Sequence, residues 1–276
     1  MRVATFNILS PLLADWHRRK KVISELLRES SPDIIALQEV DAGENREQVM
    51  AELLGPDWHV AWHSQAAPGG IGLALASRWP FGQIHEHRLD VTDRAAASPW
   101  SAVVVAEVRA PQPFGTLRIA HHKPVFQLDY EYERELQAVA AARFIEEVLD
   151  GRDDHVVLLG DFDAAPHSAS IRFWTGKQSL SGLSVSYHDT WELLRPNESG
   201  HTFTPDNPLV AHGDMFSTAG RRIDYVKVRG TSFGPTLEVR SVDRICVDPR
   251  DGVQASDHYG VLAELTVPAR APGVWG

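Results

Sequence analysis

A short apolar strand that ends in two carboxylates is the feature that most restricts how this chain folds. Residues 155–159 read His-Val-Val-Leu-Leu, which predicts a buried strand, and Gly160-Asp161-Phe162-Asp163 turns sharply off its end. Because side chains alternate along an extended chain, Asp161 and Asp163 lie on one side and Phe162 packs beneath them. The segment therefore predicts a sheet strand that carries two acids to its edge.

Polar side chains also stand at the ends of other predicted strands. They are Asn7 near the end of residues 3–9, Glu39 after residues 34–37, His121 and His122 after residues 116–120, and Asp257 and His258 before residues 261–265. A single acid after a strand is usually an exposed loop residue. Several such sets that converge at one sheet edge indicate a metal site instead.

Asp224 and the adjacent histidines carry further constraints. Residues 221–228 predict another strand, with Asp224 among apolar neighbours. Because burying an unpaired carboxylate is costly, Asp224 needs a partner, and His258 is the natural one. The adjacent His121 and His122 point to opposite faces of their strand, so one is expected to be functional and the other structural.

Amphipathic spacing predicts a few helices between the strands. Val22, Ile23, Leu26 and Leu27 form an apolar stripe, while the basic run at residues 18–21 is expected to be mostly solvated. Further helices are predicted at residues 45–54 and 130–149. The loop-rich segment 168–207 is either a substrate wall or an inert surface excursion. With no linker or repeat, residues 1–276 are expected to form a single domain.

Composition limits the class of protein. The chain of 276 residues has 43% hydrophobic residues and a net charge of −10, which argues against strong binding of duplex nucleic acid. The single cysteine, Cys246, precludes an intramolecular disulfide and fits a reducing compartment. The first residues enter a strand at once, and no apolar run reaches membrane-spanning length. A cytoplasmic location is expected, and no protein partner is indicated.

The ordered set of motifs resembles the endonuclease/exonuclease/phosphatase superfamily of divalent-metal phosphoesterases. Relatives include abasic-site endonucleases, DNase I, deadenylases and neutral sphingomyelinases. The matching segments cover nearly the whole chain, at residues 5–7, 37–40, 72–80, 120–121, 160–163, 222–225 and 256–258. The resemblance implies a four-layered α/β sandwich, with two mixed β-sheets face to face, helices outside, and the site at one edge.

The resemblance also implies a set of metal ligands. Glu39 corresponds to the principal ligand, supported by Asp257 and indirectly by Asn7. Together with three aspartates, this crowds five carboxylates into one pocket, where two like charges about 4 Å apart cost on the order of 4 kcal/mol at an effective dielectric near 20. A hard divalent cation compensates such crowding, and sparse carboxylate ligation suits Mg²⁺ or Mn²⁺.

The remaining site residues take catalytic roles by the same resemblance. Asp161 orients or deprotonates the attacking water, and His258 contacts a phosphoryl oxygen while Asp224 holds it. His121 corresponds to a histidine that stabilises the phosphate. Asp163 stands where relatives have an asparagine, which replaces an amide donor by a charged acceptor.

The function expected from the sequence is hydrolysis of a phosphodiester or phosphomonoester by direct in-line attack of water, assisted by Mg²⁺ or Mn²⁺ and without a covalent intermediate. On charge alone, a small or single-stranded phosphodiester is favoured over duplex DNA. The alternatives are a nuclease, a phosphodiesterase of lipid headgroups, and a catalytically weak binding protein of the same fold. The substrate and the number of metal ions are left open.

Overall fold

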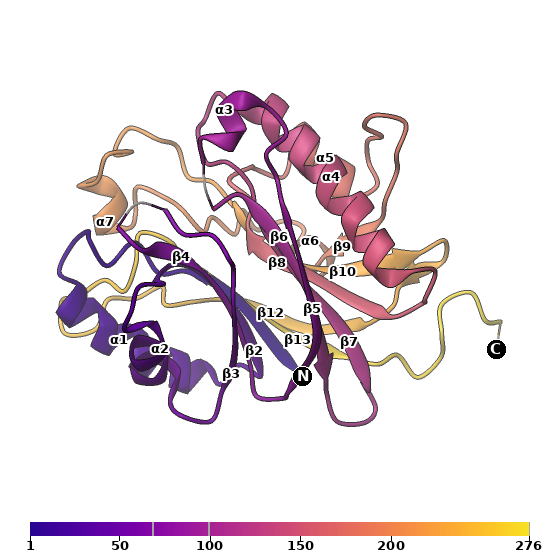
Figure 1. The fold of residues 1–276 in the computed structure, drawn as a ribbon, viewed down its shortest axis with the longest axis horizontal. Coiled ribbons are helices and arrows are strands. Elements are labelled where there is room, and N and C mark those ends of the chain that lie inside the picture. Colours follow the sequence, from indigo (N-terminus) through magenta and orange to yellow (C-terminus); the bar gives the residue numbers. More distant parts are fainter. Residues whose placement is uncertain (68, 99, 276) are drawn as a thin grey trace.

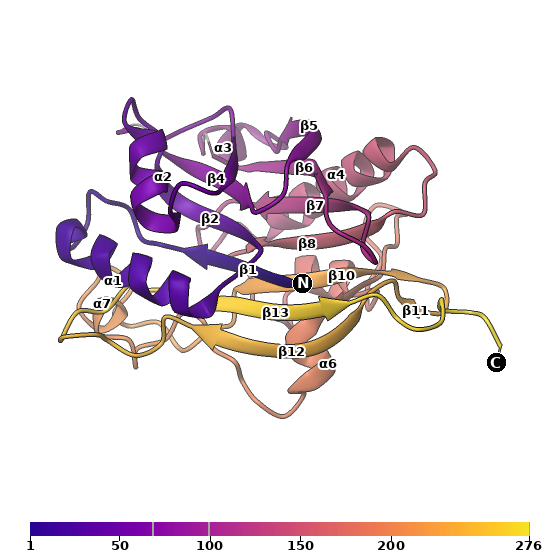
Figure 2. The ribbon, with the colours of Figure 1, turned by 90° about the horizontal axis from the view of Figure 1, so that it is seen from below.

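Two β-sheets packed face to face form the centre of the molecule, and helices cover their outer faces, in a computed structural model of this chain (Figure 1, Figure 2). The structure describes residues 1–67, 69–98 and 100–275. The arrangement is the four-layered α/β sandwich predicted from the sequence.

The first sheet has six strands in the order β12-β13-β1-β2-β4-β3. Its central pair, β1 and β2, is parallel, and the other neighbours are antiparallel. The strands are β1 (Arg2–Asn7), β2 (Ile34–Asp41), β3 (His59–Trp62), β4 (Ile71–Ser77), β12 (Glu238–Ile245) and β13 (Gly260–Thr266).

The second sheet has seven strands, with the order β11-β10-β8-β7-β6-β5 and with β9 paired to β10. Here β7 and β8 are parallel and the other pairs are antiparallel. The strands are β5 (Phe81–Arg88), β6 (Ala102–Arg109), β7 (Thr116–Lys123), β8 (His155–Asp161), β9 (Tyr187–Asp189), β10 (Asp224–Thr231) and β11 (Gly234–Pro235).

Three apolar cores separate the layers. The central one joins the two sheets, with Val3 and Val157 among its members. A second lies between the first sheet and the helices α1 (Trp16–Ser30) and α2 (Arg46–Leu54), and a third between the second sheet and α4 (Glu131–Leu149) and α5 (Ala169–Trp174). The short helices are α3 (Asp93–Ala96), α6 (Thr190–Leu194) and α7 (Pro208–Ala211). Within the described residues, no helix is both long and apolar enough to span a bilayer.

Strand direction brings the polar strand ends to one edge of the sandwich. β1 ends at Asn7 and β8 ends at Asp161, while β10 begins at Asp224 directly opposite Asp161 in the antiparallel register. β13 begins two residues after His258. Because each of these strands ends or starts at the same edge, residues far apart in sequence meet at the end of the sandwich where α7 lies (Figure 1).

Candidate active site

A pocket of about 190 Å³ opens at this edge of the sandwich. Both Glu39 and His258 line it, as the predicted site requires. Its charged and amide-bearing wall contains Asn7, Glu39, Lys123, Asp161, Asp163, Asp214, Arg221, Asp257 and His258. Of the eight predicted site residues, only Asp224 and His121 are missing from the wall. We call this cavity the strand-edge pocket.

Glu39 reaches the strand-edge pocket because β2 is irregular at this point. The pairing of β2 with β4 shifts register between Gln38 and Val40, and Glu39 has a φ of 61°. A bulge of this kind re-aims the side chain of the extra residue. The Glu39 carboxylate then accepts hydrogen bonds from Asn7 Nδ2 (3.0 Å) and from the backbone N–H of Ser10 (2.9 Å). Glu39 is therefore held in place from two sides.

Asp161 is placed by a close approach of two strands. Gly160 has a φ of 149°, and a Cβ at this position would lie 2.0 Å from the carbonyl oxygen of His122 on β7. Only glycine allows this turn, which turns Asp161 into the pocket. Asp161 accepts hydrogen bonds from Asn7 Nδ2 (3.1 Å) and from the backbone N–H of Asp163 (3.1 Å). Burial acts to raise the pKa of Asp161, but Lys123 and His258 outweigh it and lower that pKa.

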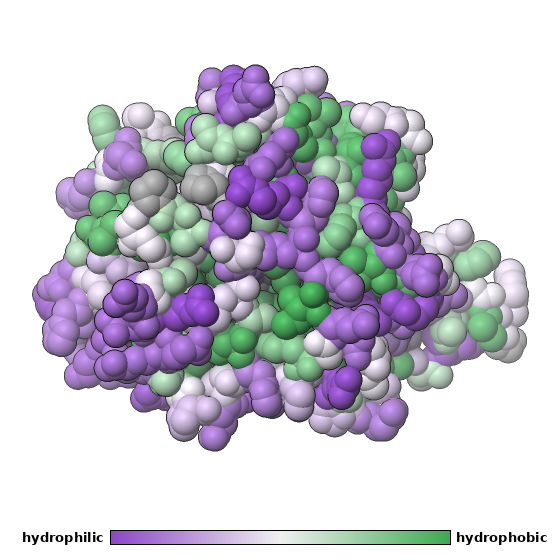
Figure 3. Space-filling view, viewed as in Figure 1, coloured by the Kyte–Doolittle hydropathy of each residue, from purple (hydrophilic) through white to green (hydrophobic). Residues whose placement is uncertain are grey.

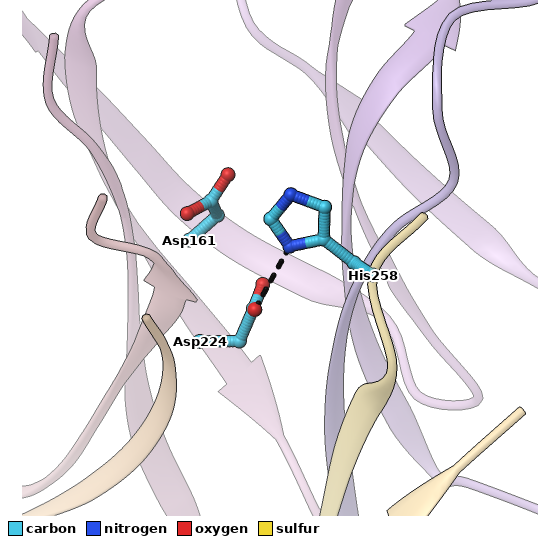
Figure 4. Close-up of side chains that lie close together, drawn as sticks. All are labelled: Asp161, Asp224 and His258. Atoms are coloured by element: carbon cyan, nitrogen blue, oxygen red, sulfur yellow. Dashed lines mark hydrogen bonds and ion pairs between the residues drawn. The ribbon is translucent and has the colours of Figure 1, made fainter. Parts of the chain in front are cut away.

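His258 and Asp224 form a buried pair, as predicted. Nδ1 of His258 lies 2.9 Å from Oδ2 of Asp224, and Figure 4 shows the Asp161 carboxylate beside the same ring. Burial lowers the pKa of His258, but Asp224, Asp161 and Asp257 together raise it to about 10. The ring is therefore an imidazolium at neutral pH, and its Nδ1–H donates to Asp224.

The same three side chains offer ligand atoms within 4.8 Å of one another and could hold a metal ion. Nδ1 of His258 is already hydrogen-bonded to Asp224, however, so Nε2 is the ring nitrogen that this group could offer to an ion. Glu39 and Asp257 lie outside this group and, unlike Asp163, have no ion pair with a basic side chain among the described residues. They are the hard oxygen donors that a divalent cation prefers.

Asp257 sits in a loop that is fixed by its neighbours. Asn207 Nδ2 donates to the backbone carbonyls of Ser256 (2.8 Å) and Asp257 (3.0 Å), and the Ser256 hydroxyl donates to Asp257 Oδ1 (3.1 Å). Burial raises the pKa of Asp257, His258 opposes this, and the negative charge of Glu39 adds to the rise. A raised pKa beside a second carboxylate is the electrostatic signature of a site that a cation would stabilise. The residues present thus fit a divalent ion.

The expected contact of His121 with the phosphate is not supported by its position. His121 has no exposed surface, and it is absent from the wall of the strand-edge pocket. Gln38 Nε2 donates to its Nε2 (2.8 Å), and its Nδ1 is bonded to His63 (3.0 Å). Burial, with His63 next, lowers its pKa well below the usual value. His121 is a neutral bridge between the sheets, and it holds the residue that precedes Glu39.

Lys123 occupies the position expected of His121. It lies two residues further along β7, on the same face and closer to the sheet edge. Its ammonium is 2.7 Å from Asp161 Oδ2 and also forms an ion pair with Asp163. Sequence reasoning identified the right strand but not this residue. The period-two pattern that links residues 121 and 123 was the available signal.

Arg19 departs from the rest of the basic run at residues 18–21, which the sequence predicts to be mostly solvated. Arg19 is 1% exposed. Its guanidinium donates to backbone carbonyls in the β1–α1 loop, among them Ile8 (2.7 Å) and Leu13 (2.8 Å), and to the carbonyl of Ala255 (3.1 Å). It therefore ties together the two loops that carry Ser10 and Asp257.

The loop-rich segment 168–207 is mostly not a substrate wall. Trp174 and Trp191 are buried in the apolar cores. Phe203 is the member of this segment that lines the strand-edge pocket, where its ring lies 5.1 Å from that of His258. The other apolar wall residues come from shorter loops, and they include Leu13, Phe126 and Met215.

Known proteins resemble this chain over almost its full length. Human sphingomyelin phosphodiesterase 2 is 26% identical over 296 aligned residues, which cover 99% of this chain and 66% of that relative. The chain thus spans just under two thirds of the length of the curated relative. TDP2 of D. rerio, solved with a single-stranded DNA product, has a TM-score of 0.76 at 16% identity and covers 97% of this chain and 99% of that one.

The catalytic domain of human Nocturnin, solved with a sulfate anion, is similar in the same way. It has a TM-score of 0.74 at 19% identity, with coverage of 97% of this chain and 94% of that one. At such identities these two structures support the fold alone. The sequence model of one family matches residues 4–258. The chain belongs to the Endonuclease/Exonuclease/phosphatase family.

Proposed function

We propose that this protein hydrolyses a phosphodiester by direct attack of water, with Mg²⁺ or Mn²⁺ as its cofactor. The observation that carries this proposal is the meeting of two unlike groups in one pocket. On one side, Glu39 and Asp257 are hard anionic donors, and on the other side the His258 imidazolium faces Asp161. Family membership supports the reaction class, a hydrolysis of phosphate esters.

Glu39 and Asp257 would hold the divalent ion, and Asn7 would keep Glu39 in place. Asn7 directs its amide nitrogen to Glu39 and Asp161, and its oxygen accepts from the backbone N–H of Leu9 (3.0 Å). This agrees with an indirect role for Asn7. When bound, such an ion supplies electrophilic stabilisation of the phosphoryl and departing oxygens.

The protein side chains carry out the remaining chemistry. Asp161 accepts a hydrogen bond from the attacking water and aims it at phosphorus. Because the pKa of Asp161 is lowered, the carboxylate stays ionised and orients the water as a hydrogen-bond acceptor. The proton that the water loses and the proton that the departing oxygen gains are exchanged with solvent. His258, fixed by Asp224, donates to the non-bridging oxygen on which charge grows, and removal of one such donor costs about 10²–10³ in rate.

Bis(p-nitrophenyl) phosphate, a soluble phosphodiester, tests this proposal. We expect turnover that EDTA abolishes and that Mg²⁺ or Mn²⁺ restores. Glu39→Gln and His258→Gln should each lower kcat/KM by about 10²–10³. Matched controls are Glu264→Gln on β13 and His85→Gln on β5, both exposed and outside the strand-edge pocket. Undiminished turnover by the EDTA-treated protein or by either pocket variant would remove the mechanism.

A phosphodiesterase of lipid headgroups is the second candidate, and a specific surface feature favours it. Large apolar side chains are exposed on three loops beside the strand-edge pocket, with Leu12 68% exposed, Leu128 59% and Phe216 66%. Their near neighbours Leu13, Phe126 and Met215 line the pocket. Figure 3 shows apolar surface beside α7, next to the hydrophilic surface of α1 and α2.

This apolar rim fits a substrate whose phosphodiester is attached to acyl chains, because loops of this kind can enter the surface of a lipid aggregate. The similarity to a sphingomyelin phosphodiesterase points the same way. With a net charge of −10, the protein has no general attraction for a polyanionic nucleic acid.

Sphingomyelin vesicles, compared with the soluble phosphodiester, distinguish the candidates. Leu12→Ser and Phe216→Ser should slow hydrolysis of vesicles at least about tenfold, since each removes about 1.5–3 kcal/mol of apolar burial in lipid. Hydrolysis of the soluble ester should not change. Phe233→Ser, at an equally exposed site in the β10–β11 turn, is the control. Equal effects on both substrates, or none on vesicles, would argue against a lipid substrate.

A further inference from the structure

One part of the strand-edge pocket already contains a fixed positive charge. The ammonium of Lys123 bridges Asp161 Oδ2, at 2.7 Å, and Asp163 Oδ2. All three side chains are nearly buried, with exposed fractions of 2% for Lys123, 1% for Asp161 and 9% for Asp163. The bridge joins the end of β7 to the turn that follows β8.

The two carboxylates of this bridge are held close together by the backbone. Asp163 has a φ of 51°, and its N–H donates to Asp161 Oδ1 (3.1 Å). Two buried acids in such a turn repel each other and require a cation between them. Burial acts to lower the pKa of Lys123, but Asp161 and Asp163 outweigh it and leave that pKa above its usual value. Lys123 therefore stays charged at neutral pH.

The part of the strand-edge pocket that contains Glu39 and Asp257 differs in its charge compensation. Among the described residues, neither Glu39 nor Asp257 has an ion pair with a basic side chain. Arg19 lies close enough to affect both electrostatically, but its Nη1 and Nη2 atoms donate to backbone carbonyls. Asp161 and Asp163 thus share the Lys123 ammonium, whereas Glu39 and Asp257 have no such partner among the described residues.

We propose that the Lys123 ammonium is a built-in cation that takes the place of a second divalent ion between Asp161 and Asp163. The protein then binds a single Mg²⁺ or Mn²⁺, at Glu39 and Asp257. The Asp163 carboxylate balances the charge of the Lys123 ammonium and fixes its position. This inference rests on the proposed function in one respect, that the pocket binds a divalent ion at all.

Counting bound Mn²⁺ by the electron paramagnetic resonance signal of the free ion tests the inference without any measurement of turnover. The unaltered protein should bind one ion per chain. Lys123→Met should bind two, because Asp161 and Asp163 then lack their cation. Lys123→Met combined with Asp163→Asn should return to one. Lys20→Met is the control, since Lys20 pairs with Glu52 on the helices and should leave the count at one.

Each outcome has a distinct meaning. Two ions in the unaltered protein, or one ion in a folded Lys123→Met variant, would overturn the inference and leave the proposed function intact. No Mn²⁺ binding by the unaltered protein would overturn the metal-dependent function itself. Circular dichroism checks that each variant folds. If Lys123→Met does not fold, the combined variant decides, because two ions there would contradict the role of Lys123 and one ion would support it.

Discussion

Replacing Asp224 by Asn isolates the charge that keeps His258 protonated. The substitution preserves the size of the side chain and an oxygen that can accept from Nδ1–H of His258, but it removes the negative charge 2.9 Å from the ring. We therefore expect the pKa of His258 to fall while the ring keeps its orientation. The proposed role of His258 needs the imidazolium, so the fall should appear as a change in the pH dependence of the reaction.

The distance between Asp224 and His258 sets the size of the expected fall in the pKa of His258. Opposite charges 2.9 Å apart interact by about 6 kcal/mol at an effective dielectric near 20. The rise of the pKa of His258 from 6.5 to about 10 corresponds to about 5 kcal/mol, at 1.36 kcal/mol per unit, after the opposing effect of burial. Asp161 and Asp257 also raise this pKa and remain in the variant. We expect a fall of about 2–3 units, to about 7–8.

Two measurements check the expected fall. Carbon-edited proton spectra of the histidine rings, with His258 assigned by its loss in His258→Gln, follow the titration directly. In the pH dependence of kcat/KM, Asp224→Asn should be about 10–100 times slower than the unaltered protein at pH 9, where few of its rings are protonated. At pH 6 the two proteins should agree within about tenfold. Asp243→Asn, an exposed carboxylate paired with Arg195, is the control.

Two results would refute this reasoning. If His258 of the unaltered protein titrates near its ordinary pKa, the buried carboxylates do not hold its proton. If the alkaline decline of Asp224→Asn stays near pH 10, Asp224 is not the charge responsible. In either case the assignment of His258 as a charged donor to the phosphoryl oxygen would have to be withdrawn.

Two further substitutions test how the backbone positions the site. Gly160→Ala should lower the free energy of unfolding by about 3 kcal/mol or more, because the new Cβ meets a carbonyl oxygen at 2.0 Å. Gly55 also has a positive φ, but no atom lies within 4 Å of a Cβ there, so Gly55→Ala should lower it by about 1 kcal/mol. Arg19→Met should lower the free energy of unfolding by about 3–5 kcal/mol and weaken Mn²⁺ binding, because the loops beside Glu39 and Asp257 lose the guanidinium that joins them. Arg18 is exposed, so Arg18→Met should change neither quantity. Urea unfolding measures the stabilities, and equal costs within either pair would contradict the structural explanation.

The sequence by itself predicted α1, α2, α4 and the strands whose polar ends meet at the pocket, but not β5 or β12. Apolar runs with period two, such as residues 155–159, predict strands because burial along an extended chain is a local property. The acids, amide and imidazole at the strand ends could be read in the same way, and their order along the chain indicated the family. The pairing of Asp224 with His258 followed from the cost of burying an unpaired charge.

Only the tertiary structure decided which polar residues reach the pocket. His121 and Lys123 share one strand face, and it is the opposing sheet, with Gln38 and His63, that covers the first and leaves the second at the edge. Arg19 looks like any residue of a solvated basic run until loop carbonyls from both ends of the chain surround it. Burial and charge compensation depend on neighbours distant in sequence, and a local pattern contains no information about them.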